Sequence, residues 1–175
     1  AMLGSCKSNH IIDELLPKLF KTYQGEFLTI IDGGAGIGDT TATYWDHLKN
    51  NLDHTLFDNV QVVCYEPLPE NVTVLRSGFG SQRQFVIKDA ALSNINGKAS
   101  FVIPSRIHNK TGLWEAGTSY SGTLRPGSTS SEKIEVNTVR IDEDDLPRVD
   151  FVKLDLQGAE ISALEGMGKR LIETK

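Results

Sequence analysis

Three glycines at alternate positions form the most distinctive motif of the sequence. Gly34, Gly36 and Gly38 follow a short apolar run and precede an amphipathic segment. Glycine tolerates positive φ angles and lets a ligand approach the backbone closely, and the N–H groups at a helix start favour an anionic or polar ligand group. A plain strand-to-helix turn would not need three alternating glycines. Because no Gly-Lys-Ser/Thr sequence follows them, the turn is not a phosphate-binding P-loop.

Carboxylates flank the glycines on both sides. Asp32 precedes the turn, and Asp39 occupies the last position of the G-x-G-x-x-G dinucleotide fingerprint counted from Gly34. Negative charge there is unfavourable for a diphosphate and suits a ligand with a cationic group, such as an ammonium or a sulfonium. A nicotinamide-dependent oxidoreductase is therefore the weaker alternative.

Further polar residues follow the next two apolar runs. Glu66 comes directly after the run 60–65, and Asp89 and Ala90 come shortly after the run 85–87. Carboxyl ends of parallel strands share one edge of a sheet, so we expect Glu66 beside the glycine turn, where it can accept both hydroxyls of a ribose. Asp89 could accept a hydrogen bond from an adenine amine, and Ala90 leaves room for the ring.

A fourth apolar run, 151–154, ends at Asp155, and Gly158 permits a turn into the last helical segment. Lys153 lies within this run. Since lysine is rarely buried without a partner, we expect it to reach a carboxylate or the rim of the site. Asp32, Glu66 and Asp155 thus predict one crevice lined by strand-end carboxylates.

The elements that must position these residues alternate between short apolar strands and helices, which is typical of a parallel α/β sheet. We expect Pro17 to kink or split the first helix. Segments 98–103 and 133–139 are predicted to be antiparallel strands on either side of a polar insert, 104–132. The expected sheet strands are 27–31, 60–65, 85–87 and 151–154, and the expected helices are 9–23, 40–52, 69–78 and 159–173.

The polar insert is rich in serine, threonine and glycine, and connections of that length are usually functional or mobile. It contains His108 and Trp114. Two interpretations stand equally: a loop that folds over a sugar-like acceptor, with Trp114 as a stacking face, and an ordinary surface loop.

Composition limits the classes of function. The 175 residues suit one domain, 1–175, with an N-terminal helical segment, 1–25, and the 18 basic and 23 acidic residues give a net charge of −5. This balance argues against nucleic-acid binding, and no apolar stretch approaches the roughly 20 residues that span a membrane. Two cysteines cannot form a disulfide framework, so we expect a cytoplasmic protein. No spacing of cysteine and histidine residues in the sequence suggests a metal site.

Several motifs together resemble the FkbM-type methyltransferases, which are S-adenosylmethionine-dependent and act largely on hydroxyls of sugars and polyketide-derived products. The matching segments span most of the chain in the family's order. The family usually has Asn at the position of Gly36 and Glu at the position of Gln157. The segments are 32–41, 65–71, 89–93, 138–142, 150–160 and 164–166.

The resemblance implies a Rossmann-like parallel sheet of the class I methyltransferase type with helices on both faces. The family continues beyond the last helix with further strands, so we expect a domain truncated after its fourth core strand and helix. It also implies that S-adenosylmethionine is the cofactor, with Asp155 near the transferred methyl group. The motifs described above and the resemblance together predict seven cofactor contacts: Asp32, Gly34, Gly36, Gly38, Glu66, Asp89 and Ala90.

Methylation of a hydroxyl on a small, sugar-like acceptor benefits from a general base. The candidates are, in falling order, Asp155, Glu160 and His108. Because Gly36 and Gln157 depart from the family pattern, a catalytically silent nucleoside-binding or assembly module of the same fold is the main alternative.

Overall fold

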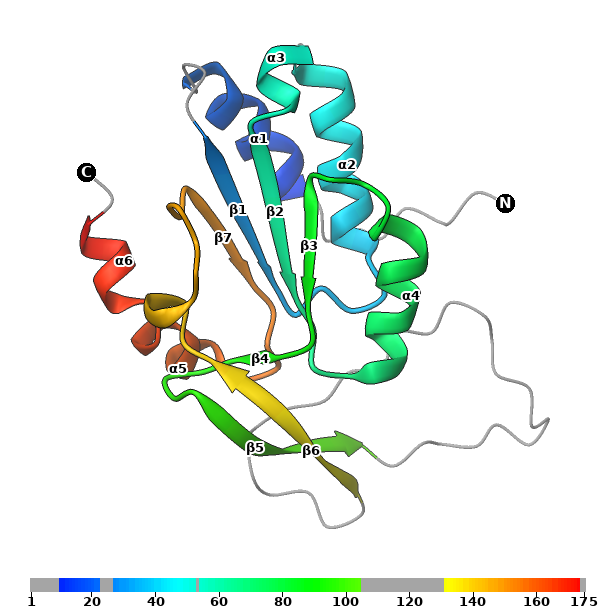
Figure 1. Ribbon diagram of the computed structural model, residues 1–175, viewed down its shortest axis with the longest axis vertical. Coiled ribbons are helices and arrows are strands. Elements are labelled where there is room, and N and C mark those ends of the chain that lie inside the picture. Colours follow the sequence, from blue (N-terminus) through cyan, green and yellow to red (C-terminus); the bar gives the residue numbers. More distant parts are fainter. Residues whose placement is uncertain (1–9, 23–26, 53, 105–130, 174–175) are drawn as a thin grey trace, which may run out of the picture.

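The computed structural model describes residues 10–22, 27–52, 54–104 and 131–173. At its centre lies a four-stranded parallel sheet with the strand order β3-β2-β1-β7 (Figure 1). This arrangement confirms the predicted α/β class and its four parallel strands. The strands are β1 (Leu28–Gly33), β2 (Val60–Tyr65), β3 (Phe85–Lys88) and β7 (Phe151–Leu154).

The register of these strands brings their carboxyl ends to one line. Gly33, the last residue of β1, pairs with Tyr65 of β2 and with Leu154 of β7, and Tyr65 pairs in turn with Lys88 of β3. The residues that follow each strand therefore meet at one edge of the sheet. This edge carries the glycine turn and the strand-end residues that the sequence singles out.

Helices cover both faces of the sheet because side chains alternate along each strand. Ile30 of β1 packs in a cluster with α1 and α2, whereas Ile31 packs on the opposite face with residues of α5 and of the segment before β7. The helices are α1 (His10–Thr22), α2 (Asp39–Asn51), α3 (His54–Phe57), α4 (Pro69–Phe79), α5 (Glu160–Glu165) and α6 (Gly168–Glu173), with a short 3-10 helix, η1 (Ile141–Glu143).

The helices differ from the expectations in two places. Pro17 lies inside α1, which is continuous, so the expected split at this residue is wrong; the buried side chains Ile12, Leu16 and Phe20 lie on both sides of the proline. The single helix expected over 159–173 is divided into α5 and α6. Its interruption includes Gly166, where an added Cβ would lie 2.0 Å from the carbonyl oxygen of Ser93, so close contact with another segment of the chain accompanies the break.

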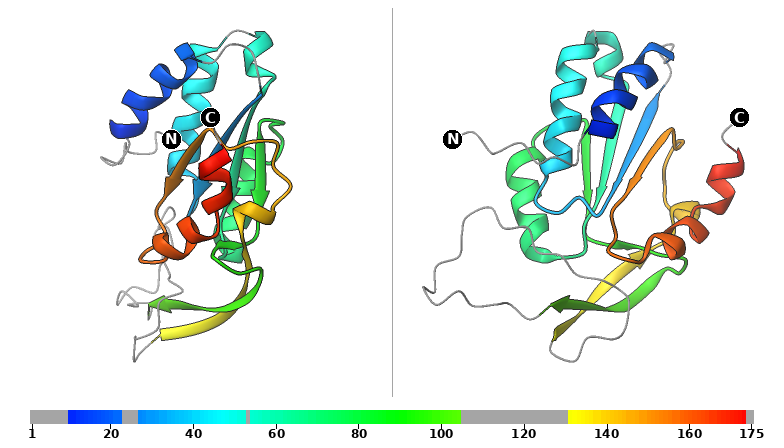
Figure 2. Two further views of the ribbon diagram at one scale, coloured as in Figure 1. Left: turned by 90° about the vertical axis from the view of Figure 1, so that its left-hand side faces the viewer. Right: turned by 180° about the vertical axis from the view of Figure 1, so that it is seen from behind.

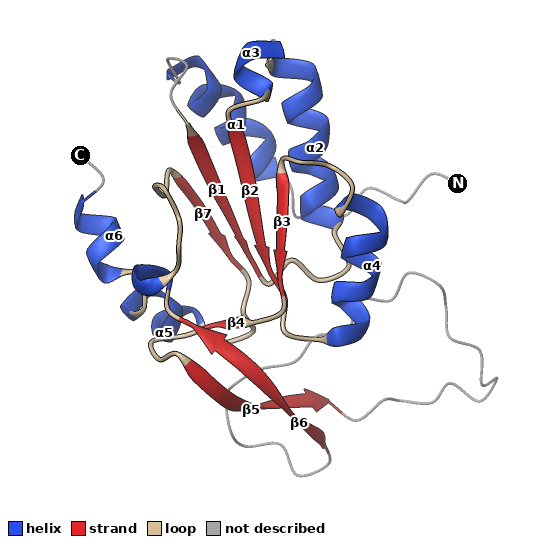
Figure 3. Cartoon of the chain, in the orientation of Figure 1, coloured by secondary structure: helices blue, strands red, loops and turns tan. Residues whose placement is uncertain are grey.

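A second, three-stranded sheet lies beyond the carboxyl edge of the first sheet (Figures 1 and 2). The predicted antiparallel pair is confirmed as β5 (Gly97–Pro104) and β6 (Ser131–Val139). A two-residue strand, β4 (Ala91–Leu92), pairs in parallel with β6 and was not predicted. Figure 3 shows that β4 follows closely after β3, so the small sheet begins at the candidate site.

Most of the polar insert, including His108 and Trp114, lies outside the described residues. Within the described parts of the chain, none of the helices has both the length and the apolar character needed to cross a membrane.

Candidate functional site

The glycine turn has left-handed backbone at all three alternating positions. The φ angles are +73° at Gly34, +58° at Gly36 and +106° at Gly38. A Cβ on Gly34 would lie 2.1 Å from the carbonyl oxygen of Asp155, and one on Gly38 would lie 2.8 Å from the ring of Phe79. Close packing therefore requires two of the glycines, in addition to the conformation that all three adopt.

Helix α2 begins immediately after this turn. Gly38 is its N-cap residue and provides no side chain to cap the first N–H groups, and the first helical residue is the exposed Asp39. Uncapped N–H groups at the start of a helix, together with the helix dipole, suit an anionic or polar ligand group such as a carboxylate. The start of α2 therefore offers uncapped N–H groups beside the glycine turn.

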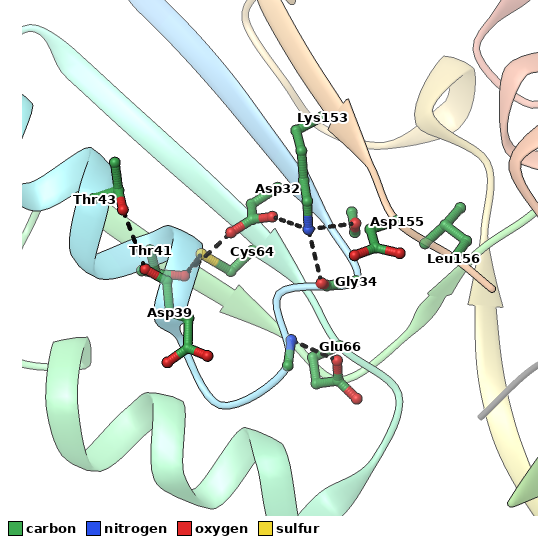
Figure 4. A network of polar contacts seen from close by, with 12 residues as sticks. Asp32, Gly34, Asp39, Thr41, Thr43, Cys64, Glu66, Lys153, Asp155 and Leu156 are labelled. Carbon is green, nitrogen blue, oxygen red and sulfur yellow. Dashed lines mark hydrogen bonds and ion pairs between the residues drawn. The ribbon is translucent and has the colours of Figure 1, made fainter. Parts of the chain in front are cut away.

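Asp32 lies beneath the turn and is fully buried. Its Oδ1 lies 3.2 Å from the Nζ of Lys153, and Thr41 donates a 3.2 Å hydrogen bond to its Oδ2 (Figure 4). Burial raises the pKa of Asp32 above its ordinary value, whereas the ammonium of Lys153 and the Thr41 hydroxyl act in the opposite direction. The expectation that Lys153 reaches a carboxylate is confirmed, and Asp32 supports the turn from inside the protein.

Glu66 joins the turn to the start of α4 and is only 4% exposed. Its Oε2 accepts a 2.9 Å hydrogen bond from the N–H of Gly36, and its Oε1 accepts from the N–H of Leu68 at 3.0 Å and from the amide of Asn71 at 3.2 Å. Burial raises the pKa of Glu66, and these hydrogen bonds oppose that shift. A carboxylate oxygen accepts two hydrogen bonds, so Oε2 retains capacity for a ligand hydroxyl.

Asp89 follows β3 at the same edge of the sheet and is exposed. Its two oxygens accept hydrogen bonds of 3.0 and 2.5 Å from the guanidinium of Arg76 on α4. This two-point contact fixes the direction of the carboxylate. Ala90, half-buried, comes next and leads into β4.

Asp155 and Glu160, the two described candidates for a general base, differ in their surroundings. Asp155 is exposed, and its Oδ1 accepts a 3.0 Å hydrogen bond from the side chain of Gln157. Glu160 accepts instead from the N–H groups of Leu156 at 2.7 Å and Gly158 at 3.0 Å. These hydrogen bonds hold together the loop that carries Asp155. Backbone hydrogen bonds also lower the pKa of Glu160, so its carboxylate is less suited to accept a proton.

Sequence reasoning missed several supporting side chains. Thr41, Asn71 and Arg76 each contact one of the predicted carboxylates, and all three lie on helices that follow a strand end. A signal was available for Asn71, because it lies in the first turn of a helix that begins just after Glu66. No local pattern identifies Arg76 as the partner of a residue 13 positions later.

Charge at the site is unevenly distributed. The buried Asp32 is matched by Lys153, whereas the exposed Asp39 and Asp155 lie near the turn. A ligand with a cationic group is therefore favoured at the surface of the site. Among the described residues, no group of three His, Cys, Asp or Glu side chains is placed to hold a metal ion.

Comparisons with known proteins identify the family and a similar fold. Residues 32–175 match the family model described as the methyltransferase FkbM domain. The fold is similar to that of a crystal structure of methyltransferase FkbM from Methylobacillus flagellatus, with a TM-score of 0.54 and 15% sequence identity over 87% of this chain. The chain spans about a third of that protein, 32% of its length. No curated protein matches the sequence.

Proposed function

Because this chain belongs to the FkbM methyltransferase domain family, we propose that it binds S-adenosylmethionine and methylates a hydroxyl of a small, sugar-like acceptor. The observation that carries the proposal is the link between the glycine turn and Glu66, a 2.9 Å hydrogen bond from the N–H of Gly36. It supports the proposal because it joins Glu66, a carboxylate of the kind that accepts a ribose hydroxyl, to a turn that suits the amino-acid end of the same ligand.

The residues at this edge fit each part of that cofactor. The glycine turn and the uncapped start of α2 would receive the amino-acid end of the ligand, and Oε2 of Glu66 would accept one ribose hydroxyl. Asp89, held by Arg76, would accept from the adenine amine, and Ala90 would leave space for the ring. Asp32 would act through the turn that it supports, because it is buried.

When bound, S-adenosylmethionine supplies an electrophilic methyl group on a positively charged sulfur. The exposed carboxylates Asp39 and Asp155 favour a cation at the surface of the site. In a nicotinamide cofactor, by contrast, the diphosphate would meet the same negative charges. The charge distribution thus favours the sulfonium ligand over the dinucleotide.

Asp155 is the residue that we assign as general base. Its carboxylate is exposed and accepts one side-chain hydrogen bond, from Gln157, so it retains lone pairs for a hydroxyl proton. It follows β7 directly, and its N–H donates a 3.0 Å hydrogen bond to the carbonyl of Gly33. Proton removal by a base at this position would raise the nucleophilicity of the acceptor oxygen, typically by about 10²–10⁴-fold in rate.

Calorimetric titration with S-adenosylhomocysteine and, separately, with NADH tests the proposal. We expect S-adenosylhomocysteine to bind with a dissociation constant in the micromolar range, roughly 1–100 μM, and NADH not to bind. Glu66→Ala should abolish binding, because it removes the ribose acceptor and frees the N–H of Gly36. Glu70→Ala, which removes an exposed carboxylate from the first turn of α4, the helix that begins shortly after Glu66, is the matched control and should bind normally.

Absence of S-adenosylhomocysteine binding by the folded wild-type chain would contradict the proposal. Equal binding by wild type and Glu66→Ala would contradict the assignment of Glu66. Tight binding without methyl transfer to a broad set of hydroxyl compounds would favour a nucleoside-binding module of the same fold.

A further inference from the structure

Lys153 is a charged residue on an apolar strand, and its position in the sheet is unusual. It lies on β7, directly opposite Asp32 of β1 in the strand register, and its side chain is 18% exposed. Lysine in such a place needs partners, since an unpaired ammonium is costly to remove from water. Its partners lie in the first strand and in the glycine turn.

The ammonium of Lys153 contacts three oxygens of this region. Its Nζ lies 3.2 Å from Oδ1 of Asp32, donates a 3.0 Å hydrogen bond to the carbonyl of Gly34, and lies 3.5 Å from the carbonyl of Gly33 (Figure 4). Two of these oxygens are backbone carbonyls that accept hydrogen bonds, and the third belongs to the carboxylate that forms an ion pair with the ammonium. Lys153 is therefore placed to organise protein groups.

The contact with Gly34 is the informative one. Gly34 has left-handed backbone and lies so close to the carbonyl of Asp155 that no side chain would fit. Its N–H donates a 3.0 Å hydrogen bond to the carbonyl of Tyr65, and its own carbonyl accepts from Lys153. The peptide groups on both sides of Gly34 are thus fixed by neighbouring strands, which determines the path of the turn that follows.

We propose that Lys153 is the positioning residue of the cofactor site, whose ammonium fixes the Gly34 carbonyl and thereby holds the glycine turn in its ligand-binding conformation. This inference rests on the proposed function of the site. Neutralisation of Asp32 is a separate contribution of the same ammonium, and it stabilises the fold. The two contributions make different predictions when the charge of Asp32 is also removed.

The assigned base follows the same strand directly. Asp155 lies two residues after Lys153, and its N–H donates to the carbonyl of Gly33 at the end of β1, so both residues contact the segment that leads into the turn. Loss of the Lys153 contact would loosen the turn relative to Asp155. We therefore expect weaker cofactor binding. The loss of affinity should be larger than the lower stability of the sheet alone would cause.

The test compares three variants by calorimetric titration with S-adenosylhomocysteine and by urea unfolding. Lys153→Met should weaken binding about tenfold or more, since it removes hydrogen bonds from a charged donor. The double variant Asp32→Asn/Lys153→Met has a neutral pair, so it should recover stability relative to Lys153→Met without recovering affinity. Asp150→Asn is the matched control because Asp150 accepts a hydrogen bond from the N–H of Thr29 at the opposite end of the same strand pair.

The control should bind S-adenosylhomocysteine within about threefold of wild type, even where it lowers stability. Wild-type affinity in Lys153→Met, or recovery of affinity together with stability in the double variant, would overturn the positioning role and leave the proposed function intact. A wild-type chain that folds but does not bind S-adenosylhomocysteine would overturn the proposed function, and the positioning role with it. Should Lys153→Met not fold, the double variant is compared with Asp32→Asn alone: we expect the double variant to bind about tenfold more weakly, and equal affinity of the two would overturn the positioning role.

Discussion

At the scale of single residues, the site separates groups that support the turn from groups that face a ligand. Asp32 is completely buried and paired with Lys153, whereas Asp155 is exposed. Both residues end a strand in the sequence, and nothing in their local sequence distinguishes them. Their different roles follow from their depth in the fold. Asp32 is buried opposite a lysine on the neighbouring strand, which pairs with its charge, whereas Asp155 lies at the surface.

The sequence correctly predicts which residues gather at the sheet edge, because apolar runs that end in polar residues define parallel strand ends. It does not predict how each carboxylate is already engaged. Glu66 accepts three hydrogen bonds from the protein, and Asp89 is held by Arg76. Asn71 follows Glu66 closely enough to give a local signal, whereas Gly36 and Arg76 meet their carboxylates only through the packing of separate segments, which no local pattern contains.

Gly34 provides a residue-scale prediction about stability. Gly34→Ala should lower the free energy of unfolding by about 2–4 kcal/mol, because it combines a positive φ angle with a clash against the carbonyl of Asp155. Gly78→Ala is the control: Gly78 lies within α4 with no atom close to an added Cβ, so it should raise stability by about 0.5–1 kcal/mol. Urea unfolding measures both, and equal effects would contradict the account of the turn.

At the scale of elements, the strands follow from the sequence more directly than the helices do. Continuous apolar runs identify all four strands of the main sheet, since strands covered on both faces contain few polar residues. The break between α5 and α6 depends instead on contact between Gly166 and the carbonyl of Ser93, residues far apart in the chain. The short strand β4 has two residues and shows no periodicity that could predict it.

A cluster on the face opposite α2 links the strands to the segment before β7. Asp144 accepts hydrogen bonds of 2.5 and 2.6 Å from the ammonium of Lys88 and of 2.5 Å from the hydroxyl of Tyr65. Although burial acts against it, these bonds hold the pKa of Asp144 below its ordinary value. The cluster therefore ties β2 and β3 to the chain that leads into β7, and it should stabilise the sheet on which the site depends.

The Asp144 cluster predicts a pH dependence of stability. A carboxyl whose folded-state pKa is depressed stabilises the protein fully above its unfolded-state pKa of about 3.9, and this contribution is lost as the pH falls through the folded-state value. Asp144→Asn should thus lower the free energy of unfolding by about 2 kcal/mol at pH 7 and by less at about pH 3. Urea unfolding at both pH values measures this, and an equal loss at the two would contradict the ionic role of Asp144.

At the scale of the whole molecule, two sheets meet at the candidate site. The carboxyl edge of the parallel sheet carries the glycine turn and the strand-end carboxylates, and the small sheet of β4, β6 and β5 lies beyond that edge (Figure 1). Ala90 leads directly into β4, so the proposed adenine contacts lie where one sheet gives way to the other. The net charge of −5 is consistent with a cationic ligand and gives no reason to expect a nucleic acid.

The most direct measurement of the central claim is hydrogen–deuterium exchange of the wild-type chain with and without S-adenosylhomocysteine. We expect slower exchange in segments 33–42, 66–72 and 88–91, which contain the glycine turn, the start of α4 and the end of β3. Distant elements such as α1 and the middle of β5 should change little. Absence of protection in the glycine turn, or protection confined to other parts of the molecule, would contradict the assignment of this sheet edge as the cofactor site.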